Sequence, residues 1–155
     1  MKKTIMLVVL GSICAGARAQ ETMQQVMEKR AREMHRVICL PDKDQWQRFI
    51  KENYTQALID KPMKSQVSAS DESGTSSERK DMEGNLDGKV NMFQRLHSDF
   101  GESKIVSIRP NGGQLKMELS GVDLTGTFTL KFTLNKPYLI DGLGIQIEGG
   151  NRFTR

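Results

Sequence analysis

Asp141, near the end of the chain, is the carboxylate best placed for chemistry. Counting back by twos from Ile147 and Ile145 places Asp141 on the inward face of an apolar strand. Burial there would raise the pKa of the carboxyl group and suit it to act as a general base. The dipeptide Asp141-Gly142 is also typical of a turn or a β-bulge, and a bulge would direct the Asp141 side chain outward. We favour the bulge.

Two histidines supply the other candidates for acid–base or metal chemistry. His35 and Cys39 are four residues apart on a predicted helix, so they share a face and could form a thiolate–imidazole pair or hold a metal. No CxxC or HxxxH pattern completes a metal site, and we expect Cys39 to be a small buried hydrophobe. His97 precedes Asp99 by two residues, and side chains at that spacing on a helix do not face each other. We therefore predict no catalytic residue, no metal and no cofactor.

Residues 1–19 have the pattern of a secretory signal peptide. A basic start, Met1-Lys-Lys3, is followed by a mostly apolar run and by an A-x-A cleavage site, Ala17-Arg-Ala19. The apolar run is too short to span a membrane. We expect cleavage between Ala19 and Gln20, and a mature protein that is periplasmic or secreted, with no stable membrane span.

The charge and the cysteine count of the mature chain limit the classes of partner and the sources of stability. Cleavage removes Lys2, Lys3 and Arg18, so the formal net charge falls by three, from +4 to +1. No basic cluster remains that would suit nucleic acid, and we expect no such partner. Cys14 leaves with the signal peptide, so Cys39 has no partner for an internal disulfide and the hydrophobic core must supply the stability.

Three amphipathic helices are predicted to position these residues. The first occupies the N-terminal segment 20–40. The second is capped by Asp42 and continues to about Asp60, with an apolar stripe of Trp46, Phe49, Ile50, Tyr54, Ala57 and Leu58. The third is capped by Asn85 or Asp87, carries Val90, Phe93, Leu96 and Phe100, and ends at Gly101. The polar segment 64–85 between the second and third helices is predicted to be a flexible loop or a disordered insertion.

After Gly101 the hydrophobic period changes from that of a helix to two, which predicts strands over 104–109, 114–120, 126–134 and 139–148. In the third strand Phe128, Leu130, Phe132 and Leu134 share one face, and Thr or Lys occupies the other. Short connections indicate an antiparallel meander. We predict a single α+β domain over 41–149, with the N-terminal helices packed on a curved four-stranded antiparallel sheet, and a tail over 150–155.

Several of these segments resemble a known family of exported domains. They are Trp46-Gln-Arg-Phe-Ile-Lys-Glu-Asn53, Phe93-Gln-Arg-Leu-His-Ser-Asp-Phe-Gly101 and the ending from Leu130 to Ile145. They resemble the accessory domain attached to secreted serine hydrolases of the beta-lactamase and penicillin-binding class, which is similar to the nuclear-transport-factor-2-like, cystatin-like fold. The resemblance covers about Pro41 to Gly149 and lacks the hydrolase domain. The resemblance therefore implies the fold and the export of this chain, and it assigns no active-site residue to it.

The combined expectation is an exported, non-catalytic domain that binds a small apolar ligand or a protein of the cell envelope, with a homodimer through the outer face of the sheet. The alternative is a small enzyme of the same fold, with Asp141, His97 or a tyrosine as its base. Ligand contacts are expected where helices and sheet diverge, from Trp46, Phe93, Phe128, Leu130, Phe132 and Asp141.

Overall fold

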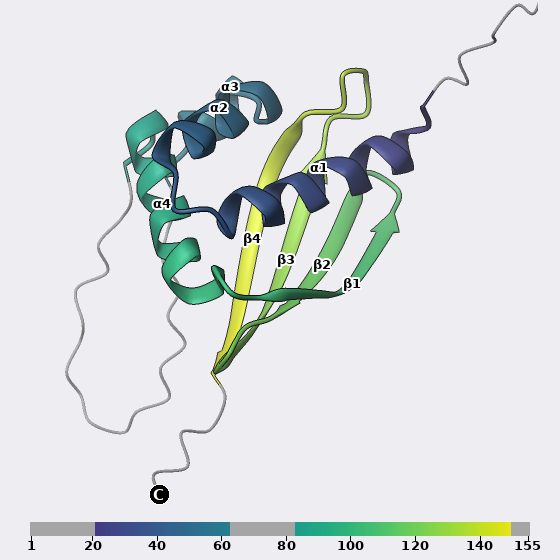
Figure 1. Ribbon diagram of the computed structural model, residues 1–155. Helices are drawn as coiled ribbons and strands as arrows, with labels where there is room; N and C mark the ends of the chain where they lie inside the picture. Colours follow the sequence, from purple (N-terminus) through teal and green to yellow (C-terminus); the bar gives the residue numbers. More distant parts are fainter. Residues whose placement is uncertain (1–20, 63–82, 150–155) are drawn as a thin grey trace, which may run out of the picture.

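The computed structural model describes residues 21–62 and 83–149 of this chain. These residues form an α+β arrangement in which helices precede a four-stranded antiparallel sheet, as predicted, and the helices lie against one side of that sheet (Figure 1). The predicted signal peptide, most of the polar insertion over 64–85 and the tail over 150–155 fall outside the described residues. No helix in the described part of the chain combines the length and apolar character needed to cross a bilayer.

Each of the three long helices begins at a polar side chain that accepts hydrogen bonds from backbone N–H groups of the first turn. Helix α1 spans Met23–Ile38, and Thr22 with Gln25 forms a capping box at its start. Helix α2 spans Lys43–Asn53, where the Asp42 carboxylate accepts hydrogen bonds from two backbone N–H groups. Helix α4 spans Leu86–Phe100 and is capped by Asn85, which decides between the two predicted caps.

The prediction that the second helix continues to about Asp60 is wrong. Helix α2 ends at Asn53, and Tyr54 has an extended backbone that forms a bridge with Ile140. The Thr55 N–H donates to the Ile140 carbonyl (2.9 Å), and the Thr55 side chain then caps a short helix α3, Gln56–Ile59. The apolar residues beyond Tyr54 therefore belong to α3 and not to α2. The chain changes direction at Tyr54 because this residue pairs with the sheet.

The sheet is a meander in the order β1-β2-β3-β4, with all pairs antiparallel. Its strands are β1 Lys104–Asn111, β2 Gln114–Ser120, β3 Leu124–Phe132 and β4 Ile140–Gly149. The turn between β1 and β2 uses Gly112 at a φ of 58°, a conformation that glycine adopts without strain. The alternation predicted for β3 is confirmed at Phe128, Leu130 and Phe132, which are all buried.

Two apolar residues predicted to point inward are exposed. Strand β3 ends at Phe132, so Leu134 lies in the following loop and its side chain is 75% exposed. Ile147 pairs with Gly126 on the sheet, but it is 47% exposed because it lies near the end of β4. Leu143 and Ile145 are partly buried against the core, as the alternation predicts.

One hydrophobic core lies between the helices and the sheet. It contains side chains from all four helices and from β2, β3 and β4. The aromatic rings of Phe100 and Phe128 meet edge-on across its centre, with centroids 5.4 Å apart. Helix α2 packs beside α1 and against α4, and the outer surfaces of α1 and α2 form the candidate site described next.

Candidate binding groove between α1 and α2

The six residues expected to contact a ligand do not form one open site. Five of them lie in the core with at most 5% of their surface exposed: Trp46, Phe93, Phe128, Leu130 and Phe132. Asp141 is separate from this group, because its side chain is exposed on the surface. Whether the five buried residues contact a ligand stays a prediction.

Asp141 lies in a β-bulge, as the sequence interpretation favoured. Lys131 pairs with Gly142 and Phe132 pairs with Ile140, which leaves Asp141 as the extra residue of β4. Its carboxylate accepts a hydrogen bond from the Thr55 hydroxyl (2.8 Å). The contact ties β4 to the start of α3, so the structure gives Asp141 a connecting role between these two elements.

His35 and Cys39 do meet, beside Ser103 at the start of β1. The His35 Nε2 lies 3.5 Å from the Cys39 sulfur, 3.1 Å from the Ser103 carbonyl oxygen and 3.2 Å from the Ser103 hydroxyl. Burial lowers the pKa of His35, partly offset by its bond to the Ser103 backbone, and burial raises the pKa of the Cys39 thiol. Both shifts favour neutral groups and oppose a thiolate–imidazolium pair. Among the described residues no group of three His, Cys, Asp or Glu side chains could hold a metal ion.

Acid should destabilise the fold through His35. The unfolded chain titrates His35 near pH 6.5, whereas the folded chain titrates it at a lower pH. Below about pH 6.5 the unfolded chain therefore binds a proton that the folded chain does not, and stability falls as the pH drops. We expect urea unfolding at about pH 7.5 and about pH 5.5 to show this loss for the wild type and a smaller loss for His35→Gln. An equal loss in both proteins would contradict the assignment.

His97 has a structural role as well. Its Nδ1 lies 2.8 Å from the Ile38 carbonyl oxygen at the end of α1, and its ring packs on Trp46 with centroids 5.8 Å apart. Asp99, two residues later, is exposed. The two side chains form no dyad, as their spacing on α4 predicts.

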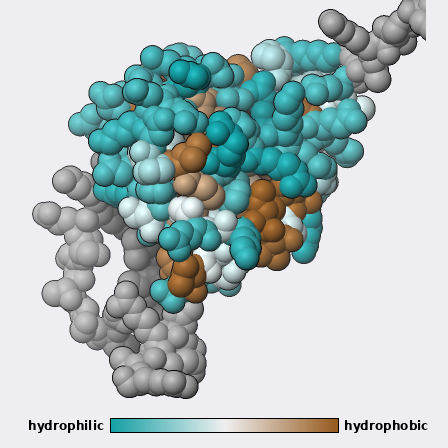
Figure 2. Space-filling model, in the orientation of Figure 1, coloured by the Kyte–Doolittle hydropathy of each residue, from teal (hydrophilic) through white to brown (hydrophobic). Residues whose placement is uncertain are grey.

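Among the described residues, a groove of about 450 Å³ lies between α1 and α2, and we call it the α1–α2 groove. The surface over these helices is mostly hydrophilic (Figure 2). The floor of the groove contains the apolar residues Val26, Val37 and Phe49. Charged or amide side chains form the rest of the lining: Glu21, Lys29, Arg30, Glu33, Arg36, Gln45, Arg48, Glu52 and Asn53.

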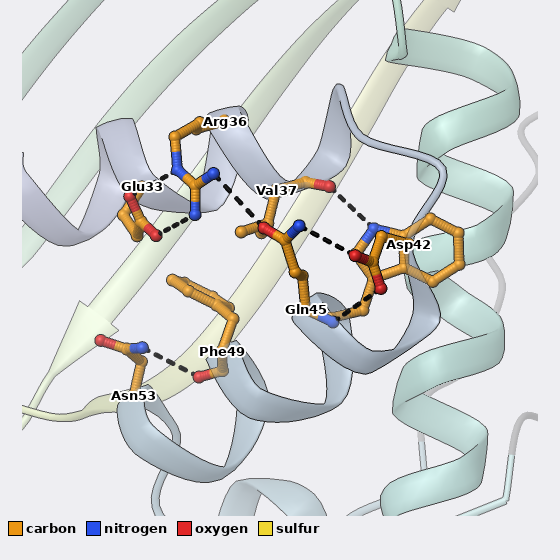
Figure 3. Close-up of polar contacts among 8 residues, drawn as sticks. Glu33, Arg36, Val37, Asp42, Gln45, Phe49 and Asn53 are labelled. Atoms are coloured by element: carbon orange, nitrogen blue, oxygen red, sulfur yellow. Dashed lines mark hydrogen bonds and ion pairs between the residues drawn. The ribbon is translucent and has the colours of Figure 1, made fainter.

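A chain of polar contacts joins the two helices beside the α1–α2 groove (Figure 3). The Arg36 guanidinium donates to both Glu33 carboxylate oxygens (3.0 and 2.7 Å) and to the Gln45 amide oxygen (3.4 Å). The Gln45 amide nitrogen in turn donates to the Asp42 carboxylate (2.9 Å). The hydrogen bond from Arg36 lowers the pKa of Glu33, and that from Gln45 lowers the pKa of Asp42. The charged groups of Glu33, Arg36 and Asp42 are therefore already hydrogen-bonded within the protein.

Arg30 on α1 differs from the other cations of the groove, because its side chain is half-buried and its hydrogen-bond partners among the described residues are neutral groups. Its guanidinium donates to the side-chain oxygen of Asn53 on α2 and to the Pro137 carbonyl (2.9 Å). The Nε of Arg30 is buried and has no hydrogen-bond partner among the described residues. Burial lowers the pKa of Arg30, yet an arginine side chain stays charged under ordinary conditions.

The remaining charges of the groove carry a small positive excess. In the described part of the chain, Lys29 forms an ion pair with Glu21 and Arg36 with Glu33, whereas no ion pair includes Arg30 or Arg48. Glu52 is the lining carboxylate outside these pairs. From the sequence, the segment 20–40 is predicted only as an amphipathic helix, and Arg30 is not singled out. Charge spacing on α1 alone gave no signal for the groove, because α2 supplies its second wall.

Comparison with protein-family models, with curated proteins and with solved structures finds no match to this chain.

Proposed function

We propose that this chain is an exported, non-catalytic binding domain, and that the α1–α2 groove binds a short acidic segment of a partner protein. The observation that carries the proposal is Arg30, a half-buried cation in the groove wall, which has neutral hydrogen-bond partners and forms no ion pair within residues 21–62 and 83–149. A carboxylate in the groove would supply the missing opposite charge. Export rests on the pattern of residues 1–19.

Partial burial makes Arg30 a better anchor for an anion than a fully exposed cation. Part of its hydration is already lost in the folded chain, so a bound carboxylate would meet a cation that is fixed in place and poorly solvated. Hydrogen bonds to charged groups contribute about 1.5–3 kcal/mol, whereas exposed ion pairs contribute about 0.2–1 kcal/mol. Arg48, on the opposite wall, adds a second positive charge.

The floor of the groove adds an apolar requirement to this ligand. Val26, Val37 and Phe49 contribute to the lining, so a segment that alternates acidic and apolar side chains fits better than a free dicarboxylate. A ligand can enter the α1–α2 groove from solvent, whereas the five buried residues named from the sequence are covered by other side chains. Neither Asp141 nor His97 lines the groove, and no observation favours the alternative of an enzyme.

We also propose that the helices and sheet form the nuclear-transport-factor-2-like, cystatin-like arrangement that the sequence resembles. Supporting it are the long N-terminal helix lying along the sheet and the antiparallel meander that follows the helices (Figure 1). A partner in the cell envelope agrees with export. A homodimer through the outer sheet face remains a prediction, and the Thr127 and Thr129 side chains of that face are partly exposed.

The binding proposal predicts that a fluorescein-labelled peptide of alternating Glu and Leu binds the chain, and that Arg30→Gln weakens this binding at least about tenfold. Tenfold corresponds to about 1.4 kcal/mol, close to the lower limit for a charged hydrogen bond. Arg48→Gln should weaken binding as well, and added salt should weaken it in the wild type. Fluorescence anisotropy measures each affinity.

Arg95→Gln on α4 is the matched control, because Arg95 is exposed and lies outside the groove. It should bind the peptide as the wild type does. Arg30→Lys, which keeps the charge and loses the planar donor set, should bind with intermediate affinity. Equal binding of a Lys–Leu peptide, or unchanged affinity in Arg30→Gln, would rule out the acidic-segment proposal.

A further inference from the structure

The free edge of β4 exposes backbone groups in a defined pattern. The Phe132 N–H donates to the Gly113 carbonyl, toward β2, and the Thr55 N–H donates to the Ile140 carbonyl from outside the sheet. Backbone groups alternate in direction along a strand, so the even residues of β3 point toward β2. Their partners on β4 must then point away from β3. These partners are Leu143, Ile145, Ile147 and Gly149.

Among the described residues these four edge positions have no backbone partner. Strand β4 is the last strand of the sheet, and the bridge from Tyr54 reaches only Ile140, before the bulge. Figure 1 shows β4 at one border of the sheet and β1 at the other. An unpaired strand edge of this kind is a template for another strand.

The two borders of the sheet differ in how they are protected. Strand β1 has a bulge at Val106, contains Pro110 and carries the cations Lys104 and Arg109, all of which discourage edge pairing. Strand β4 after its bulge has neither proline nor lysine, and Glu148 is its one charged residue. The border at β4 is therefore the one open to an added strand.

We propose that this edge pairs with the same edge of a second copy of the chain, antiparallel, with Gln146 on the two-fold axis. In this register Leu143 faces Gly149 of the other copy, and Ile145 faces Ile147. All four outward-pointing residues then form reciprocal hydrogen bonds, and the two sheets become one continuous sheet of eight strands. Moving the axis to Ile145 or Gly144 leaves Gly149 unpaired.

The side chains of β4 are compatible with this self-pairing. Ile147, which is 47% exposed in the single chain, would lie beside Ile145 of the second copy, and apolar cross-strand pairs of this kind stabilise sheets. On the outer face Glu148 would lie opposite Gly144, so no two like charges face each other. The symmetric register satisfies hydrogen bonds, apolar contact and charge together, which argues for a second copy over an unrelated strand.

A cysteine at the axis tests the proposal in a Cys39→Ser background. Gln146 pairs with itself in a position without reciprocal hydrogen bonds, where Cα atoms lie about 4.5 Å apart, within disulfide range. We expect Gln146→Cys to form a covalent dimer under mild oxidation. Glu148→Cys is the matched control on the same face. It should stay monomeric, because residue 148 of one copy faces residue 144 of the other and lies four residues away from the second introduced thiol.

Mixing Glu148→Cys with Gly144→Cys should restore the cross-link, because these positions face each other across the axis. A side chain at residue 144 fits, since a Cβ there meets nothing closer than 3.8 Å. Sedimentation of the Cys39→Ser chain should show a concentration-dependent dimer that Gln146→Lys weakens by placing two cations face to face. Absence of a dimer in sedimentation, or equal cross-linking of Gln146→Cys and Glu148→Cys, would overturn the proposal. None of these variants alters the α1–α2 groove, so the result is independent of peptide binding.

Discussion

Replacing Phe128 with alanine is expected to lower the free energy of unfolding by about 3–5 kcal/mol, as large-to-small changes in a packed core do. Phe128 is fully buried on the helix-facing side of β3, between Met117 on β2 and Ile145 on β4. Its ring also meets Phe100 of α4 edge-on. Removing the ring would leave a cavity that side chains from three strands and a helix cannot close. Urea unfolding followed by circular dichroism measures the loss.

Thr129→Ala is the control, since Thr129 is the next residue of β3 and lies on the outer face, partly exposed. It should change the unfolding free energy by no more than about 0.5 kcal/mol. Phe128 was also named from the sequence as the wall of a ligand cavity. If Phe128→Ala leaves the unfolding free energy nearly unchanged and alters the binding of an apolar dye, Phe128 lines a ligand cavity, and its assignment to a packed core is wrong.

Trp46→Ala should cause a loss of similar size, about 3–5 kcal/mol, for a partly different reason. The Trp46 indole N–H donates to the carbonyls of Val37 (2.7 Å) and Leu40 (3.0 Å), where α1 ends. The ring itself is 3% exposed and packs on His97 of α4. One side chain thus connects three helices, and its removal costs packing and leaves carbonyl groups at the end of α1 with fewer donors.

Trp46→Phe separates these two contributions. It keeps most of the ring and removes the donor, so it should cost about 1–3 kcal/mol, the penalty for a buried polar group that loses its partner. Gln47→Ala on the same turn of α2 should have little effect. A loss below about 1 kcal/mol for Trp46→Ala would contradict the position of the indole in the core.

The strands could be predicted from the sequence because one side of the sheet is buried and the other is wet. The alternation of apolar and polar residues in β2 and β3 correctly predicted both strands and the side of the sheet on which Phe128 and Leu130 are buried. The same rule erred at Leu134, since alternation continues in the sequence after the last pairing of β3. Where a strand ends depends on its neighbour, and the sequence of one strand does not contain that information.

Long-range contacts also explain the errors among the helices. Tyr54 continues the apolar stripe of α2, yet the chain there turns to pair with Ile140, more than eighty residues later. Lys89 is 1% exposed on α4, although the pattern placed apolar residues alone on the buried side. Its amine donates to the Lys61 carbonyl, and burial lowers its pKa. Neither feature has a signal within a short window of sequence.

The candidate site was the least predictable part of the molecule. The sequence singles out Asp141 and His97 as candidates for chemistry, whereas in the structure both residues make contacts that connect separate elements. The proposed binding at the α1–α2 groove instead depends on Arg30, whose hydrogen-bond partners are neutral: Asn53 from α2 and Pro137 from the β3–β4 loop. Those surroundings appear only when three distant segments of the chain are brought together.

A nuclear magnetic resonance titration of the isotope-labelled chain with the Glu–Leu peptide would show directly whether the α1–α2 groove binds an acidic segment. We expect saturable shifts of backbone amides in α1 and α2 around the groove, including those of Arg30 and Arg48, and no shifts on the outer face of the sheet. Shifts confined to the sheet or to the core residues near Phe128 would contradict the assignment of the binding surface, as would the absence of any saturable shift.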